Sequence, residues 1–298
     1  MNQIVQSLIV GPGAIGSLVC AHIQQYSQVW VYRHKPNLVL PNQAYTDTLI
    51  DLRWCPLENN HQPIDLIWLC SKAEYSLALA TKLLTQHSQA SVVLLHNGMG
   101  PQQLLAEHFP GRVIFAMTTN AVFKQADRIF HQKAFGVTPL GYPLATNPIQ
   151  HNWVSTIAKW PGNMGFQADD RILSSLWKKL AMNAVVNPLT AYYQVKNGAL
   201  IGSEYKEAIS FLCHEIELIA WAENIALPSP LTETIYDVIS LTSDNYSSMQ
   251  QDIYFKRKTE IEFILGFLLT LAEQHQIDTP HLQHWYLTIL SLQNSFLD

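Results

Sequence analysis

The residues best suited to chemistry lie in one segment with a helical pattern, residues 177–188 (WKKLAMNAVVNP). Lys179, Asn183 and Asn187 recur at every fourth position, which places one ammonium group and two amides in a single row on one helix face. The surrounding positions are mostly apolar, so the row would be costly to bury without hydrogen-bond partners. Asparagine is also a poor residue for a helix interior. A solvated helix face is the simpler explanation for such a row, but these surroundings favour a bound ligand.

The row alone leaves the identity of its ligand open, but the lysine has a known chemistry. A lysine ammonium stabilises charge that develops on a carbonyl oxygen and can deliver a proton to it. A free lysine has a pKa of about 10.4 and is a reluctant donor, but partial burial would lower that pKa. Asn183 and Asn187 could hydrogen-bond the same ligand.

A glycine-rich loop near the N-terminus predicts a dinucleotide site. A short apolar run, residues 6–10, leads into the loop, and a helical pattern follows over residues 17–26. Strand, G-x-G-x-x-G and helix is the context that the dinucleotide fingerprint requires. The glycines allow a tight turn, close approach of a pyrophosphate and close helix packing, and the helix N-terminus favours phosphate. The predicted contacts are Gly11, Pro12, Gly13, Ala14, Ile15 and Gly16.

The end of the second strand predicts which dinucleotide binds. The strand covers residues 29–32 and is followed by Arg33, at the position where NAD-binding domains carry an acidic residue. A guanidinium group can hold a 2′-phosphate through two parallel hydrogen bonds, so we predict NADPH rather than NADH. The alternative is that Arg33 is merely an exposed residue at a strand end.

Three further buried strands are predicted over residues 64–70, 91–95 and 113–117, with helices over 74–84 and 101–108 between them. Lys72 and Asn97 follow two of these strands, at the sheet edge where open α/β sheets bind ligands. A β-hairpin is predicted from residues 128–131 and 136–140. This alternation predicts an α/β fold with a Rossmann-type doubly wound sheet.

The second half of the chain predicts only helices. We place the domain boundary at residue 169, which gives a nucleotide-binding domain over 1–168 and an all-helical domain over 169–298, with a cleft between them. Ser247 or Ser248 would cap one of the helices. If that helix ran unbroken, Ser248 and Glu260 would lie about 18 Å apart. A short helix is expected over residues 149–159, and the helices of the second domain over 170–194, 204–225, 229–241, 248–274 and 280–294.

Composition narrows the possible functions. The net charge of −5 argues against nucleic acid and acidic membranes as partners. The four cysteines are far apart and the twelve histidines are scattered, so the sequence predicts no metal site and no disulfides. Neither a signal peptide nor an apolar stretch long enough to cross a bilayer is present, so we expect a cytoplasmic protein that acts on a small molecule.

These motifs together resemble the ketopantoate reductase (2-dehydropantoate 2-reductase) family over nearly the whole chain. The blocks that carry the resemblance are Gly11–Gly16, Lys72–Ala73, His96–Gly100, Thr118–Thr119, Trp177–Ala191, Asn197–Gly198 and Asn245–Phe267. The resemblance implies reduction of ketopantoate to pantoate with NADPH, a step toward pantothenate and coenzyme A. It also implies a helical second domain like the C-terminal domain of 6-phosphogluconate dehydrogenase, in a monomer or homodimer.

The resemblance also assigns roles to individual positions. Lys179 matches the family's general acid, and Asn97 lies at the junction of cofactor and substrate. The positions that match substrate contacts are Asn97, Asn183, Asn187, Asn197 and Ser248. Those that match cofactor contacts, besides the glycine-rich loop, are Arg33, Lys72, Asn97, Val122 and Glu260. The chain departs from the family at Asn120 and Val122, where His and Ala are expected, although a backbone contact at Val122 would survive.

Two other functions are compatible with these motifs. One is an NADPH-dependent reductase of a different branched 2-oxo acid, because function belongs to the site rather than to the fold. The other is a non-catalytic NADP-binding sensor, which needs the glycine-rich loop and Arg33 but not Lys179. The presence of Lys179 together with its asparagine row argues against the sensor.

Overall fold

A computed structural model describes residues 4–32, 43–45, 48–50, 53–54, 63–126, 129–143 and 152–297. The chain divides into two compact units. The first unit comprises Met1–His96 and Pro101–Ile172, and the second comprises Asn97–Gly100 and Leu173–Asp298. The short segment Asn97–Gly100 therefore packs with the second unit, although it follows a strand of the first.

The first unit is built on an eight-stranded sheet with the order β12-β11-β8-β7-β6-β1-β2-β5. Six neighbouring strands of this sheet are mutually parallel: β8, β7, β6, β1, β2 and β5. Strand β11 is antiparallel to β8, and β12 is parallel to β11. This arrangement confirms the predicted doubly wound sheet. The strands are β1 (Val5–Val10), β2 (Ser27–Tyr32), β5 (Arg53–Trp54), β6 (Leu66–Leu69), β7 (Ser91–Leu94), β8 (Val113–Ala116), β11 (Thr138–Gly141) and β12 (Phe166–Ala168).

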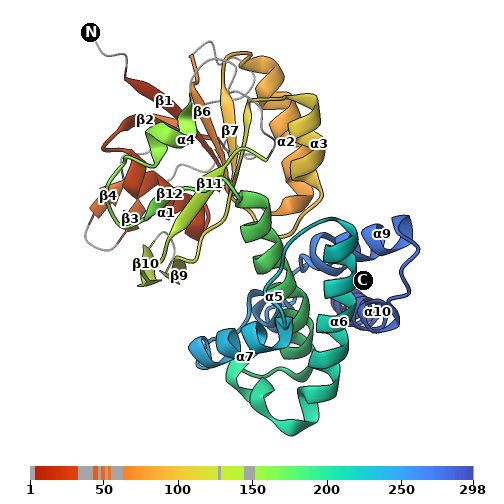
Figure 1. The fold of residues 1–298 in the computed structure, drawn as a ribbon. Helices are drawn as coiled ribbons and strands as arrows, with labels where there is room; N and C mark the ends of the chain where they lie inside the picture. The colour runs from red at the N-terminus through yellow and green to blue at the C-terminus, as the bar shows by residue number, and fades with distance from the viewer. Residues whose placement is uncertain are drawn as a thin grey trace. The chain divides into compact units, whose positions relative to one another are not determined.

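Helices cover both faces of this sheet. Helices α2 (Ala73–Gln86) and α3 (Pro101–His108) lie side by side on one face, while α1 (Ala14–Ile23) and α4 (Trp153–Ile157) lie on the other (Figure 1). The three strands β6, β7 and β8 are buried along their whole length. Coverage on both faces explains why these strands read as continuous apolar runs rather than alternating patterns.

A second, four-stranded sheet has the order β4-β3-β10-β9. The predicted hairpin between residues 128–131 and 136–140 is wrong, because β10 pairs antiparallel with β9 whereas β11 joins the large sheet. Thr138 and Leu140 are fully buried there, so β11 buries more surface between β12 and β8 of the large sheet than a free hairpin could. The strands are β3 (Gln43–Tyr45), β4 (Thr48–Ile50), β9 (Ala121–Ala126) and β10 (Ile129–Ala134).

The second unit is helical in its described residues, as predicted. Its longest elements are α5 (Ile172–Tyr193), α6 (Lys206–Ala222) and α10 (Pro280–Leu297). Helix α5 continues through Pro188, which removes one backbone hydrogen bond without ending the helix. The remaining elements are α7 (Leu231–Leu241), α8 (Ser248–Tyr254), α9 (Phe267–Gln274), the π-helical turn η4 (Glu262–Gly266) and the 3₁₀ turns η2 (Asn197–Ile201) and η3 (Ser203–Tyr205).

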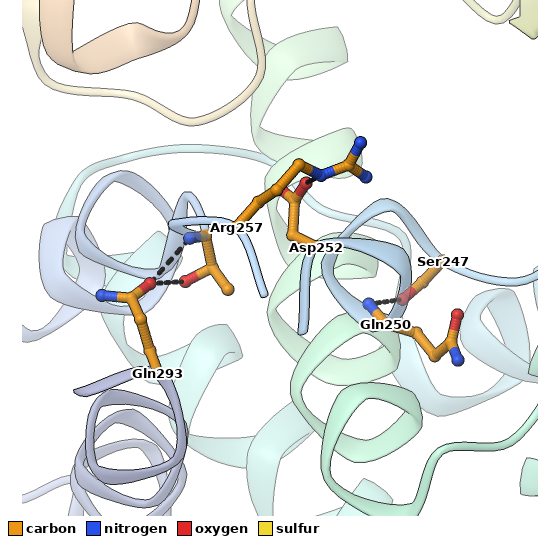
Figure 2. A network of polar contacts seen from close by, with 6 residues as sticks. Ser247, Gln250, Asp252, Arg257 and Gln293 are labelled. Atoms are coloured by element: carbon orange, nitrogen blue, oxygen red, sulfur yellow. Dashed lines mark hydrogen bonds and ion pairs between the residues drawn. The ribbon is translucent and has the colours of Figure 1, made fainter. Parts of the chain in front are cut away.

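The predicted single helix over residues 248–274 is wrong. Helix α8 ends at Tyr254, and Lys256 adopts a left-handed conformation with φ of 52°. After the break, the side chain of Asp252 accepts from Arg257 Nε at 2.9 Å, and Gln293 Oε1 accepts from the backbone N–H of Thr259 at 2.6 Å (Figure 2). The bond from Gln293 occupies a backbone N–H group that a continuous helix would use, a feature that periodicity alone does not reveal.

Candidate functional site

The glycine-rich loop of the first unit has the geometry that a pyrophosphate requires. Gly11 has φ of 87°, and a Cβ atom there would lie 2.7 Å from the backbone nitrogen of Ser71. A Cβ atom on Gly16 would lie 2.2 Å from the carbonyl oxygen of Gly11, whereas one on Gly13 would meet no atom within 4 Å. The loop is therefore closed toward the protein and open at Gly13, where helix α1 begins.

The polar groups around this loop also suit an anion. The N-cap residue of α1, Gly13, offers no side-chain cap, so the first N–H groups of this helix face the open space at the loop. The hydroxyl oxygen of Ser71 is buried and has no hydrogen-bond partner among the described residues. Pro12, Ala14 and Ile15 are half-buried. These residues fit the pyrophosphate of a dinucleotide.

The other cofactor positions predicted in the first unit occupy different places. Lys72 is half-buried and is the N-cap residue of α2, where its carbonyl oxygen accepts from Tyr75 N at 3.1 Å. Val122 lies in β9, is half-buried and packs against the hydrophobic cluster that includes helix α1. Arg33 lies outside the described residues, so its prediction stays a prediction.

Asn97 belongs to the second unit and contacts Glu260 there. The side-chain amide of Asn97 donates to Oε2 of Glu260 at 3.1 Å. Met99 N also donates to Phe263 O at 2.8 Å. Gly98 has φ of 76°, and a Cβ atom there would lie 2.5 Å from Cβ of Phe263. A glycine is therefore required at position 98 to bring Asn97 this close to the π-helical turn.

Lys179 is half-buried on α5, and its pKa is shifted both by burial and by the charge of Glu260. Desolvation lowers the pKa of Lys179 from 10.5 to about 8, and the negative charge of Glu260 opposes that shift. A lysine of this kind is still mostly protonated at neutral pH but yields its proton more readily than an ordinary lysine. Lys179, Glu260 and Asn97 thus form one polar group, and the fully buried Ala181 and Ala184 continue α5 beyond it.

The amide row continues from Lys179 along α5 into more buried surroundings. Asn183 is half-buried and Asn187 is buried. One turn after Asn187, the hydroxyl of Thr190 donates to Oγ of Ser247 at 2.7 Å. Ser247 Oγ in turn accepts from Gln250 N at 3.0 Å (Figure 2) and so caps α8. Ser248 is the first residue of that helix and is exposed. The Thr190–Ser247 bond therefore joins the part of α5 that carries Asn187 to the start of α8, where Ser248 lies.

Asn197 approaches the same region from η2. Its side-chain amide donates to Oγ1 of Thr242 at 2.9 Å, and its backbone N–H donates to Asn245 O at 2.9 Å. Asn197 is buried, and its Oδ1 atom has no hydrogen-bond partner among the described residues. A buried acceptor of this kind is costly unless a ligand or water supplies a donor. Asn197 is therefore suited to bind a hydroxyl group.

The candidate residues of the second unit form two groups along α5. The first group consists of Lys179, Glu260 and Asn97. The second group consists of Asn187, Asn197 and Ser248. The segment from Ser247 to Glu260 contacts α5 near Thr190 at one end and near Lys179 at the other. These positions are about 16 Å apart at a rise of about 1.5 Å per residue, so Ser248 and Glu260 serve different groups.

Sequence reasoning missed one residue of the second group, Thr190, and left open which serine caps α8. Thr190 follows Asn187 by three positions and so belongs on nearly the same helix face, a signal that the sequence already contained. The cap is Ser247, which is buried, whereas Ser248 is exposed. Burial of one of two neighbouring serines is decided by packing and leaves no sequence signal.

The described residues contain neither a cluster of metal-binding side chains nor a membrane-spanning helix. Within those ranges, no group of three or more His, Cys, Asp or Glu side chains is placed to hold a metal ion. No helix in the same ranges is both long and apolar enough to cross a membrane.

Comparison with known proteins places the chain in a family. It is 32% identical to a 2-dehydropantoate 2-reductase of Vibrio cholerae, over 97% of this chain and 98% of the relative. Among solved structures, 2-dehydropantoate 2-reductase from Methylococcus capsulatus shares the fold with a TM-score of 0.84 at 22% identity, over 99% of this chain and 98% of that one. D-mandelate dehydrogenase with NADH and anilino(oxo)acetate shares it with a TM-score of 0.83 at 19% identity, over 98% and 100%.

Family models extend these pairwise likenesses to both parts of the chain. The model described as ketopantoate reductase PanE/ApbA matches residues 7–144, and the model of the C-terminal part of the same family matches residues 171–292. The two matches include the glycine-rich loop, Lys179 and Glu260. The chain therefore belongs to the ketopantoate reductase PanE/ApbA family.

Proposed function

We propose that this protein reduces ketopantoate, a branched 2-oxo acid with a hydroxyl group, to pantoate with NADPH. The observation that carries the proposal is Lys179, whose pKa is lowered to about 8 beside Glu260. Family membership and the Vibrio cholerae relative, which matches over nearly its whole length, support this substrate.

Lys179 would supply the proton in this reaction. NADPH, when bound, supplies a hydride to the carbonyl carbon. The ammonium group of Lys179 would stabilise the negative charge that develops on the carbonyl oxygen and then transfer its proton to that oxygen. Glu260 would keep Lys179 protonated at neutral pH, because its negative charge raises the pKa that burial lowers.

The second group of polar residues would hold the substrate. Asn183, Asn187 and the buried acceptor of Asn197 could bind the hydroxyl end of ketopantoate, with the exposed hydroxyl of Ser248 beside them. The carboxylate, which is bonded to the carbonyl carbon, would lie at the Lys179 end. Buried amides that lose their ligand partner remain unsatisfied, so a substrate without the hydroxyl would be disfavoured. This arrangement gives the enzyme a reason to prefer ketopantoate over simpler 2-oxo acids.

The cofactor would be held mainly by residues of the 1–168 domain, with catalysis in the 169–298 domain. The glycine-rich loop would bind the pyrophosphate of NADPH, and Arg33 its 2′-phosphate. Lys72, Asn97, Val122 and Glu260 are the remaining proposed cofactor contacts. The protein would act as a monomer or a homodimer.

The test is oxidation of NADPH by the purified protein with three 2-oxo acids. Ketopantoate is compared with 2-oxoisovalerate, which lacks only the hydroxymethyl group, and with benzoylformate, the oxo acid related to mandelate. We expect kcat/KM for ketopantoate to exceed that for 2-oxoisovalerate by at least about a hundredfold. Equal rates with both acids would contradict the substrate assignment, and no oxidation with any acid would favour an NADP-binding sensor.

A further inference from the structure

One buried amide, that of Asn120, joins the two sheets of the first unit. Asn120 is 6% exposed and follows β8, where the chain leaves the large sheet to begin β9 of the small one. Both ends of the amide are used. Its Nδ2 lies 2.9 Å from Thr118 Oγ1, 3.1 Å from Met164 O and 3.3 Å from Thr138 Oγ1, and its Oδ1 accepts from Gln132 Nε2 at 2.7 Å and from Gly136 N at 3.0 Å.

The partners of Asn120 come from four different segments. Gln132 lies in β10 of the small sheet, Thr138 begins β11 of the large sheet, and Met164 precedes β12. Thr138 Oγ1 also donates to Met164 O at 2.8 Å and lies 3.0 Å from Thr118 Oγ1. A buried network in which these groups satisfy one another fixes a single arrangement of the segments, because any shift leaves buried polar atoms unpaired.

The segment after β8 is held from a second side as well. Thr119 N donates to Val137 O at 3.0 Å, and Val137 N donates to Thr119 Oγ1 at 2.9 Å. A Cβ atom on Gly136 would lie 2.3 Å from Thr119 Oγ1, so the segment before β11 approaches the segment after β8 more closely than another residue would allow. Residues 118–120 are therefore fixed between β11 and the loop before β12.

This fixed segment leads directly to the nucleotide-binding elements. Val122, two residues after Asn120, packs against the hydrophobic cluster that contains Leu18 and Val19 of helix α1. Strands β9 and β10 both contact α1, which begins at the glycine-rich loop. The position of Asn120 thus determines how β9 starts and where the backbone of Val122 lies.

We propose that Asn120 is a positioning residue for the nucleotide, which holds residues 118–122 so that the backbone at Val122 contacts NADPH. The inference rests on the proposed function for its ligand, but the hydrogen-bond network itself does not. A purely structural role would make Asn120 matter for stability alone. Positioning requires in addition that cofactor affinity changes in variants that remain folded.

The test compares Asn120→Ala and Asn120→Asp with Asn163→Ala and Asn163→Asp. Asn163 is exposed and neighbours Met164, so its variants repeat the same chemical changes beside the network without removing the Asn120 amide. The dissociation constant for NADPH is measured by fluorescence titration, well below the unfolding temperature of each variant. We expect both Asn120 variants to bind NADPH about tenfold more weakly, which corresponds to about 1.4 kcal/mol, and both Asn163 variants to bind as the wild type does.

Turnover separates positioning from catalysis. With saturating NADPH, kcat of the Asn120 variants should stay within about twofold of the wild type, because the lost interaction acts on cofactor binding. An unchanged dissociation constant in a folded Asn120 variant would overturn the proposal, even if its unfolding temperature falls. A large loss of kcat with unchanged affinity would overturn it as well.

A second variant keeps the test decisive if Asn120→Ala does not fold. Gln132→Met removes one of the two donors to Asn120 Oδ1, together with the longer bonds from Gln132 Nε2 to Ala134 O and Asn163 O. It leaves the bond from Gly136 N in place, so it should weaken NADPH binding in the same direction by a smaller factor. Amide hydrogen exchange at Thr119 and Val137 should also become faster than in the wild type. If the wild type binds no NADPH, the proposed function fails, and unchanged exchange in Gln132→Met would then overturn the network's role separately.

Discussion

The lowered pKa of Lys179 makes the pH dependence of turnover the most direct test of its role as the acid. A general acid must be protonated in the free enzyme to contribute to kcat/KM. Burial lowers the pKa of Lys179 from 10.5 to about 8. The active, protonated form therefore predominates below pH 8 and is lost as the pH rises through that value.

The expected size of the effect follows from this pKa. Lys179 is about 90% protonated one unit below its pKa and about 10% protonated one unit above it, so kcat/KM should fall about tenfold between pH 7 and pH 9. A lysine with its ordinary pKa would lose only a few per cent of its protonated form over the same interval. The two cases are easily distinguished.

A change at Glu260 tests the same pH dependence of kcat/KM in a second way. Its negative charge raises the pKa of Lys179, so Glu260→Gln should move the alkaline limb to lower pH. Glu260 also accepts from Asn97 at 3.1 Å, so the variant is judged by the position of the limb and not by its absolute rate. Lys179→Met should abolish turnover, and Lys178→Met, which changes the exposed neighbouring lysine, should leave both rate and limb unchanged.

The assay is the initial rate of NADPH oxidation at subsaturating ketopantoate, in buffers of constant ionic strength from pH 6 to pH 10. NADPH is kept saturating so that the limb reports on the acid rather than on cofactor binding. A kcat/KM that stays flat to pH 10 would refute the assignment of Lys179 as proton donor. So would a limb that stays in place in Glu260→Gln.

Three further predictions concern stability, each measured by urea denaturation. Glu215 is buried and accepts from the backbone N–H groups of His281 and Leu282 at 2.9 and 2.8 Å. Glu215→Ala should therefore lower the free energy of unfolding by about 2–3 kcal/mol. The control, Glu107→Ala, changes an exposed residue and should lower it by less than about 0.5 kcal/mol. Lys256 has φ of 52°, so Lys256→Gly should gain up to about 1 kcal/mol. Burial lowers the pKa of His22 below 6.5, so the unfolded chain binds a proton more readily, and stability should fall as the pH drops through 6.5.

Each stability prediction has an outcome that contradicts it. A loss in Glu215→Ala no larger than in Glu107→Ala would mean that the carboxylate does not stabilise the start of α10. A destabilised Lys256→Gly would mean that chain entropy outweighs the left-handed strain. The pH dependence assigned to His22, which packs against Tyr26 and Phe166, should disappear in His22→Leu, and its persistence would assign it to another group.

The sequence predicted the large sheet well because its strands are buried on both faces. Strands such as β7 and β8 read as continuous apolar runs, and helices with helical periodicity separate them. The hairpin error arose from the same rule, since alternation in residues 136–140 says that a strand forms but not which strand it pairs with. Pairing of β11 with β8 is decided by the tertiary packing of Thr138 and Leu140.

Side-chain bonds over long sequence separations account for the other errors. The break after α8 is held in part by Gln293 on α10, and its contact with Thr259 joins residues 34 positions apart. Likewise, Asn97 and Glu260 are 163 positions apart in the sequence and are in contact. Residues Asn97–Gly100 also belong to the second unit. Periodicity describes only neighbours along the chain, so neither contact had a signal there. The resemblance to a family supplied the residue list, but it carried no information about these partners.

The order of residues along α5 has a physical reason. Lys179, the titrating group, is half-buried, whereas Asn187, two turns further on, is buried. An amide carries no charge, so burial does not change its protonation state. A lysine buried as deeply would lose its proton, because desolvation penalises the charged form. Glu260 adds a compensating charge at the lysine end, and Thr190 and Ser247 add hydroxyl groups at the amide end. Exchanging Lys179 and Asn187 would therefore place a neutral amine among the amides and remove the proposed proton donor, even though the helix would keep the same composition.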